Sequence, residues 1–276
     1  MAAFEIIDGF KCYSPKLAIS NNGFSADSFS FLRQVEENNF WFKVRNRTII
    51  GLIKKYSGRS GNKKLLEIGC GTGYVLSGLS ASTDFQLSGS DIHVEGLKYA
   101  QQRVPTAEFI QMDATEMPFE NEFDAIGAFD VLEHISEDEL ALKNIHKSLC
   151  PNGVLYISVP QYMFMWSSLD EISFHKRRYS KAELMQKVTA AGFKIEYCGS
   201  FVFSLFPLMV FSRFLLQRKE KAASGNEEFK INRFLNAALE SVLSLDEFLI
   251  KTGFRLPFGG SLLCVARKTD LKNFNK

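Results

Sequence analysis

The sequence has no marked excess of charge of either sign. Its 276 residues include 33 Lys and Arg against 31 Asp and Glu, a formal net charge of +2. We find no basic stripe of the kind that indicates nucleic-acid binding, so no nucleic-acid partner is expected. With 46% apolar residues, the chain can bury one sizeable core, or a core and a small appended domain.

Cysteine is scarce and unpatterned. The five cysteines form no C-x-x-C pair, which is typical of reduced thiols in a cytosolic protein, and no metal site is expected. The N-terminus lacks a basic stretch followed by an apolar one, so we expect no signal peptide and a cytoplasmic location. Internal repeats and long low-complexity tracts are also absent.

Short apolar runs alternate with amphipathic segments from about residue 64 to 160. The runs "KLLEIG", "FQLSGSD", "EFIQMD", "FDAIGAFD" and "GVLYISVP" are typical of strands, and the segments between them of helices. This alternation predicts a Rossmann-like α/β fold with a parallel sheet covered on both faces. Such sheets bind ligands at the carboxyl ends of their strands, where the strand order reverses.

The chain divides into four expected segments. They are an N-terminal helical lid at 1–60, a ligand-binding core at 61–200, a helical insertion or cap at 201–258, and a final edge strand and tail at 259–276. The insertion is expected to hold two helices around the polar break "KEKAASGNEE".

The stretch "LLEIGCGTGYVLSGL" places glycines at 69, 71 and 73, where a strand turns into a helix. Glycine allows positive φ and removes the side chain that would block a ligand. A dinucleotide-binding fingerprint needs glycine at the sixth position, which here is Tyr74, so an NAD-dependent oxidoreductase is disfavoured. The alternative is that the glycines simply allow tight packing of helix on strand.

Carboxylates follow the next three strands, at Asp91, Asp113 and Asp130. Together with the glycine loop they fit a ligand that has a ribose, an amine-bearing base and little negative charge. Each carboxylate alone could instead be a solvated turn residue or a helix N-cap.

These motifs, "LEIGCGTG", "GSD", "QMDA", "FDAIGAFDVLEHI" and "PNGVLYISVP", resemble in order and spacing those of class I S-adenosylmethionine-dependent methyltransferases. The resemblance implies a seven-stranded, mostly parallel sheet with an antiparallel last strand, and S-adenosylmethionine as cofactor with S-adenosylhomocysteine as product. The residues that it places along the cofactor are Glu67, Gly69, Cys70, Gly71, Gly73, Asp91, Ile92, Asp113, Ala114, Asp130 and Val131.

The N-terminal "EENNFWFKVRNRTI" is a second candidate for cofactor contacts. In methyltransferases of this kind, a helix before the first strand closes over the cofactor. Trp41, Phe42 and Arg45 could form that lid, with Arg45 pairing with the cofactor carboxylate. The alternative is an amphipathic helix that packs its aromatic residues into the core.

His134, in "VLEHI", is the candidate catalytic base. Methyl transfer from a sulfonium is an in-line displacement, for which the protein positions the acceptor and excludes water. A hydroxyl or protonated amine must also lose a proton to a base. The alternative is a histidine at a helix start that is hydrogen-bonded to backbone.

The loop "MFMWSSLDEISFHKRRYS" is the candidate acceptor site. His175, Arg177 and Arg178 are expected to bind substrate, with the arginines clamping an acidic group. Tyr179 is expected to be catalytic, contacting the acceptor and shielding the sulfonium from water. The alternative is a structural ion pair between an arginine and Asp170 or its neighbour.

We therefore expect a methyltransferase that acts on a small-molecule or lipid-linked acceptor, at oxygen or nitrogen. The alternatives are a non-catalytic cofactor-binding protein and, less favoured, an NAD-dependent oxidoreductase. The apolar segment 201–219 is interrupted by Pro207 and Arg213 and is too short for a bilayer, which needs about 20 residues. It could lie on a membrane surface or cap the acceptor pocket. The oligomeric state stays open.

Overall fold

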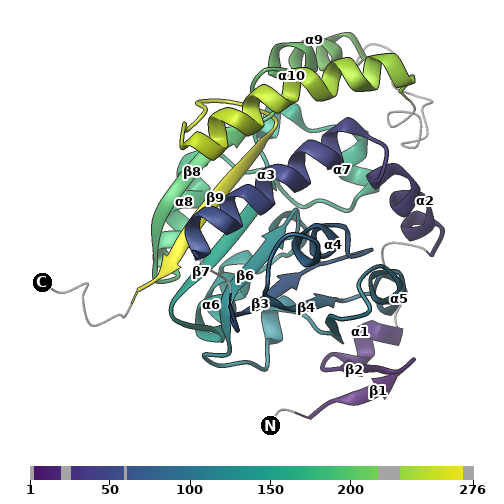
Figure 1. Cartoon of the computed structure of the whole chain (residues 1–276), viewed down its shortest axis with the longest axis vertical. Helices are drawn as coiled ribbons and strands as arrows, with labels where there is room; N and C mark the ends of the chain where they lie inside the picture. Colours follow the sequence, from purple (N-terminus) through teal and green to yellow (C-terminus); the bar gives the residue numbers. More distant parts are fainter. Residues whose placement is uncertain (1–2, 20–25, 59–60, 217–230, 270–276) are drawn as a thin grey trace, which may run out of the picture.

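A nine-stranded sheet forms the centre of the computed structural model, which describes residues 3–19, 26–58, 61–216 and 231–269 (Figure 1). From edge to edge the strands are β1 (Glu5–Ile7), β2 (Phe10–Cys12), β5 (Glu108–Gln111), β4 (Gln86–Asp91), β3 (Lys64–Ile68), β6 (Phe123–Phe129), β7 (Leu149–Pro160), β9 (Ser261–Lys268) and β8 (Phe193–Phe201). The six strands from β2 to β7 run parallel to one another, whereas β1 is antiparallel to β2 and β9 is antiparallel to both β7 and β8. The predicted α/β class with an antiparallel last strand is confirmed.

Two features of the sheet differ from the expectation. Strands β1 and β2 extend the seven-stranded unit at the β5 edge, through pairing of Lys11 with Ile110. The expected edge strand β9 lies between β7 and β8, so the edge prediction is wrong. Ser261–Ala266 is buried throughout, with Leu262 and Leu263 entering opposite core layers. Burial on both faces shows that the sheet is covered on each side at β9, and its interior position comes from its pairing with both β7 and β8.

Helices cover both faces of the sheet (Figure 1). One face carries α3 (Phe40–Ser57), α4 (Tyr74–Ser80) and α5 (Val94–Arg103), and the other carries α6 (Asp138–Ser148) and α8 (Lys181–Ala190). The remaining helical segments are α1 (Pro15–Ile19), α2 (Ala26–Glu36), α7 (Ser168–Ile172), α9 (Phe206–Leu216), α10 (Arg233–Thr252) and the 3₁₀ turns η1 (Ala114–Glu116), η2 (Leu132–His134) and η3 (Met163–Met165).

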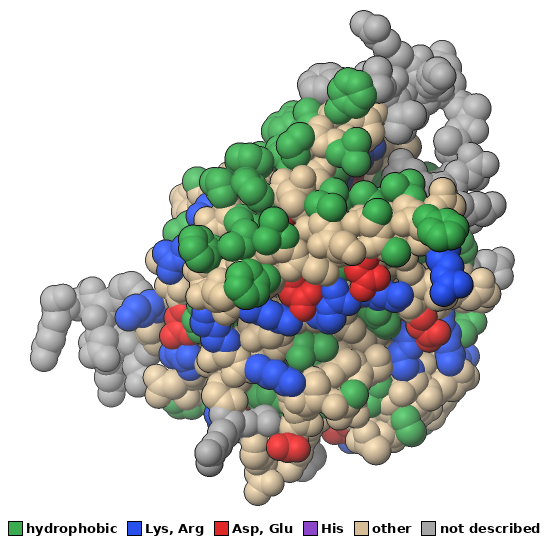
Figure 2. Space-filling view, turned by 45° about the horizontal axis from the view of Figure 1, so that its top comes forward, with side chains coloured by type: hydrophobic (Ala, Val, Ile, Leu, Met, Phe, Trp, Pro, Cys, Tyr) green, Lys and Arg blue, Asp and Glu red, His purple; other side chains and the backbone are tan. Residues whose placement is uncertain are grey.

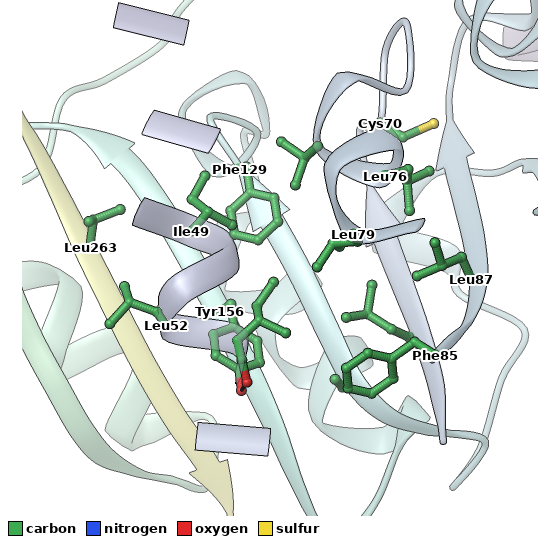
Figure 3. Close-up of a cluster of buried hydrophobic side chains, with 14 of the residues drawn as sticks. Ile49, Leu52, Cys70, Leu76, Leu79, Phe85, Leu87, Phe129, Tyr156 and Leu263 are labelled. Carbon is green, nitrogen blue, oxygen red and sulfur yellow. Dashed lines mark hydrogen bonds between the residues drawn. The ribbon is translucent and has the colours of Figure 1, made fainter. Parts of the chain in front are cut away.

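The core follows from the alternation of side chains along each strand. In β3, Leu65 enters the layer beneath α3 and α4, while Leu66 enters the layer beneath α6 and α8. Figure 3 shows the first layer, where Ile49 and Leu52 of α3 face the sheet beside the α4 leucines. Each such side chain contributes about 1.5–3 kcal/mol on full burial.

The insertion between β8 and β9 contains α9 and α10, as expected, and the polar break between them lies outside the described residues. The guanidinium of Arg47 on α3 holds α10 by donating to Glu247 at 2.9 Å, Glu240 at 2.8 Å and Ser244 at 3.1 Å. The buried carboxylate of Asp246 accepts backbone N–H groups from the turn before α9. Both helices are therefore anchored on the core.

Among the described helices, none combines the length and the apolar character that crossing a bilayer requires.

Candidate functional site

The strand order reverses between β3 and β6. From β3 the chain moves outward through β4 and β5, then returns to the other side of β3 as β6. The carboxyl ends of β3 and β6 therefore border the crevice where such sheets bind ligands. The two loops that leave these strands meet there, since a Cβ on Gly69 would collide with the side chain of Val131.

The three glycines of the loop after β3 have different reasons for being glycine. All have positive φ, of 65°, 50° and 76°. A Cβ on Gly73, at the start of α4, would lie 3.0 Å from the backbone of Ala100, so close packing explains this position. A Cβ on Gly71 would meet no described heavy atom within 4 Å. Packing accounts for Gly69 and Gly73, but Gly71 borders open space.

Asp91 ends β4 beside this loop. It is buried, and its carboxylate accepts the backbone N–H of Gly71 at 3.0 Å and that of His93 at 2.9 Å. Burial raises the pKa of Asp91, while these N–H groups oppose the shift. The carboxylate therefore fixes the glycine loop against the start of α5, and each oxygen keeps a second lone pair for a ligand.

Glu67 lies beneath the loop, within β3. Its Oε2 is buried and has no hydrogen-bond partner among the described residues. Burial raises the pKa of Glu67 to about 8, and the charge of Arg45 opposes that shift. An unsatisfied buried carboxyl oxygen is suited to a cationic ligand group, such as the ammonium of a methionine moiety.

The other expected cofactor residues differ in how they are placed. Ile92 is exposed next to Asp91, and Ala114 is buried in η1. Asp113 is the N-cap of η1, and its Oδ1 accepts the Thr115 N–H at 2.8 Å. One carboxylate oxygen is thus used in helix capping, which was the alternative to binding the cofactor. The Cys70 side chain packs into the core beneath α4 (Figure 3), which leaves its backbone as the part that could border a cofactor, so its expected contact stays a prediction.

Arg45 reaches the site from α3, but its ion pair is internal. The guanidinium Nη2 lies 2.5 Å from Asp130 Oδ2 and donates to Ser158 Oγ at 3.2 Å. The Trp41 ring lies 5.2 Å from the guanidinium. In this structure the Arg45 guanidinium, which was expected to pair with the cofactor carboxylate, pairs with Asp130 instead. Asp130 has a φ of 56°, a conformation that costs a non-glycine residue roughly 1–2 kcal/mol.

Three side chains meet beside this crevice, from η2 and the loop after β7. The His134 and His175 rings pack edge to face with centroids 4.7 Å apart. His175 Nε2 lies 4.0 Å from Glu133 Oε1, and Glu133 is fully buried. Burial is the main cause that lowers the pKa of His134 to about 4, and the neighbouring His175 acts in the same direction. His134 is thus neutral at neutral pH, and its role as base stays a prediction.

Burial of Tyr179 contradicts its expected contact with the acceptor, whereas Arg177 and Arg178 form internal ion pairs and their binding of substrate stays a prediction. Arg178 forms a two-pronged ion pair with the buried Asp170, at 2.7 and 2.8 Å. Tyr179 is 1% exposed and donates its hydroxyl to Asp138 at 2.7 Å, and Arg177 pairs with the same carboxylate at 3.0 Å. The structural alternative, an ion pair with Asp170, is the one observed.

Local backbone pairing explains this orientation. Tyr179 bridges to Gln161, and its N–H donates to the Pro160 carbonyl at 2.9 Å, so the segment pairs with the carboxyl end of β7. Its side chain thereby enters the core layer of α6 and α8. Glu133 was not singled out from the sequence. In the sequence it is a single acid that follows the apolar Leu132, and this pattern does not indicate that its side chain is buried.

Comparisons with known proteins match the part of the chain that carries this site. Residues 66–157 match the family model for a methyltransferase domain. The chain is 27% identical over 163 residues to the Mycolicibacterium smegmatis protein named "Probable S-adenosylmethionine-dependent methyltransferase", over 58% of this chain and 62% of that one. It is 23% identical over 210 residues to a Rickettsia typhi ubiquinone biosynthesis O-methyltransferase, over 68% and 80% of the two chains.

The solved structure of Haemonchus contortus phosphoethanolamine N-methyltransferase 2 in complex with S-adenosylmethionine has the same fold. The TM-score is 0.61 at 16% identity, over 91% of this chain and 59% of that one. The family match covers the segment that carries the glycine loop and the strand-end carboxylates. Residues 66–157 therefore form a methyltransferase domain, and the chain is similar to S-adenosylmethionine-dependent methyltransferases.

Proposed function

We propose that this protein transfers a methyl group from S-adenosylmethionine to a small-molecule or lipid-linked acceptor, at oxygen or nitrogen. The observation that carries the proposal is the carboxyl end of β3, where Gly71 borders open space and Glu67 Oε2 lacks a partner among the described residues. Asp91 beside them can accept from ribose hydroxyls. A pyrophosphate would meet three carboxylates here, which disfavours NAD.

Within that class we favour a lipid-linked acceptor. Apolar side chains gather over α9 and α10, next to a band of charged residues (Figure 2). Phe211, Phe234 and Phe248 are 62%, 90% and 62% exposed. Exposed apolar surface of this extent marks a contact with a partner, ligand or membrane.

The apolar surface is continuous with the loop after β7. Phe206 of α9 packs against Tyr162 and Phe164 of that loop, with ring centroids 5.8 and 6.5 Å apart. One face of α9 is therefore a cap over the loop, and the other is exposed. An acceptor with an apolar chain could contact this surface while its reactive group enters the crevice. The names of two relatives, a ubiquinone biosynthesis O-methyltransferase and a demethylmenaquinone methyltransferase, support an acceptor of this kind.

Two measurements test the proposal. Titration calorimetry should show binding of S-adenosylmethionine and S-adenosylhomocysteine and none of NAD; the reverse pattern would overturn it. Transfer of labelled methyl groups should then be followed in aqueous and lipid extracts. Label in the lipid fraction supports the lipid-linked acceptor, label in the aqueous fraction alone contradicts it, and cofactor binding without transfer to either supports a non-catalytic protein.

A further inference from the structure

Glu133 is an unusual acid in this site. It is 0% exposed, and neither carboxylate oxygen has a hydrogen-bond partner among the described residues. The acids around it are paired, since Asp130 meets Arg45, Asp138 meets Lys187 and Asp170 meets Arg178. A buried carboxylate without a partner is costly, so the position calls for a positively charged or donor group that the described side chains do not supply.

Two histidine rings face this carboxylate. One ligand atom from each of Glu133, His134 and His175 can be chosen so that all lie within 4.8 Å of one another. Ligand atoms bound about 2.1 Å from one cation lie at most about 4.2 Å apart. The 4.0 Å between His175 Nε2 and Glu133 Oε1 already falls within that limit. Small side-chain rotations would bring the third atom into range.

A hydrogen bond to Asp170 fixes the orientation of the His175 ring. Its Nδ1 lies 2.8 Å from Asp170 Oδ1, and Asp170 also accepts from Arg178 and from the Ser167 N–H. A carboxylate that already pairs with an arginine acts as acceptor, so we assign the ring proton to Nδ1. His175 Nε2 then presents its lone pair toward Glu133. A carboxylate behind a histidine in this way is the usual support of a metal-binding imidazole.

We propose that Glu133, His134 and His175 bind one divalent transition-metal ion, such as Zn²⁺, Mn²⁺, Fe²⁺ or Co²⁺. Two imidazoles and one carboxylate favour these ions over Mg²⁺ and Ca²⁺, which prefer oxygen ligands throughout. A bound ion would supply positive charge at Glu133, whose nearest cationic candidate among the described side chains, His175, lies 4.0 Å away at Nε2.

The role of the ion rests on the proposed function, although its binding does not. Three protein ligands leave coordination positions open, where an acceptor hydroxyl can bind. The cation lowers the pKa of that hydroxyl, and its proton passes to water. The oxygen then bonds to the methyl carbon while the carbon–sulfur bond breaks, which converts the sulfonium to a neutral thioether. In this scheme His134 is a ligand and not a base.

Metal binding can be tested on the full chain without cofactor. Chelator-treated protein is titrated with Co²⁺ and with Zn²⁺, following the Co²⁺ absorption bands, the bound metal per chain and the melting temperature. We expect one ion per chain and a metal-induced rise in melting temperature. Glu133→Gln and His175→Gln should weaken binding more than about 100-fold. The control His146→Gln changes a histidine on α6 outside the cluster and should bind like the parent.

The Glu133→Gln variant also separates binding from folding. Because it removes an unpartnered buried acid, its melting temperature without metal should equal or exceed that of the parent, and the metal-induced rise should disappear. No saturable binding by the parent, or equal binding by Glu133→Gln, would overturn the inference. Calorimetry with S-adenosylmethionine on the same metal-free samples tests the proposed function separately, since cofactor binding without metal binding rejects the metal site alone.

Discussion

Replacing Asp91 by alanine should weaken both folding and cofactor binding. The change leaves the N–H groups of Gly71 and His93 without their acceptor in a buried position. At about 1–2 kcal/mol for each such group, the free energy of unfolding should fall by about 2–4 kcal/mol. Separately, the two ribose hydroxyls lose a charged acceptor. The free energy of cofactor binding should therefore weaken by about 2–4 kcal/mol, or about 30- to 1,000-fold in Kd.

Urea denaturation and calorimetric titration with S-adenosylmethionine measure the two effects separately. Glu116→Ala, which removes an exposed acid on η1, is the matched control and should change neither quantity. Because the variant is expected to be less stable, binding has to be measured at a temperature where it is folded. Otherwise unfolding would be mistaken for a loss of cofactor affinity. A variant as stable as the parent would refute the anchoring role of Asp91, and one that binds the cofactor equally well would refute its contact with the ribose.

Three further predictions concern other parts of the chain. Because the folded-state pKa of Glu67 is raised to about 8, its contribution to stability is complete below pH about 4 and is lost as the pH rises through about 8. Glu67→Gln should therefore flatten the decline in stability over that range in urea titrations at several pH values; an unchanged slope would contradict it. Tyr179→Phe should lower the free energy of unfolding by about 1–3 kcal/mol, because Asp138 loses a buried donor, and should leave cofactor affinity within a few-fold. Normal stability with lost turnover would instead restore the acceptor role. Anionic liposomes should float the parent protein but not a Phe211→Ser, Phe248→Ser variant, whereas Ile6→Ser, an exposed residue of β1, serves as control; equal flotation of both variants would remove the membrane contact from α9 and α10.

The central sheet was predictable because its signals are local. Period-two and helical patterns alternate between residues 64 and 160, and glycines mark the turn from β3 into α4. Strands β1 and β2 were missed because three residues are too few for a periodic pattern, and β2 pairs with a strand almost 100 residues away. The interior position of β9 depends on the order in which strands pair, which its own composition does not determine.

The site was predictable only where backbone conformation or strand position determines it. Gly71 and Asp91 follow from the loop and the strand end. Tyr179 was misplaced, because polar residues in a loop suggest exposure, whereas folding brings Asp138 to it. Glu133 illustrates the same limit, since burial of a charged group depends on three-dimensional neighbours that a local pattern does not contain.

The ion pairs between Arg47 and α10 couple the movement of α10 to that of α3. Arg45 and Arg47 lie two residues apart on α3, one directed to Asp130 in the crevice and the other to Glu240 and Glu247 on the cap. A tilt of α3 that opens the cofactor site would therefore pull on α10 as well. One helix, α3, therefore joins the cofactor site to the apolar surface that we propose for the acceptor. Hydrogen exchange in α3 and α10 should slow together when the cofactor binds, before any acceptor is present.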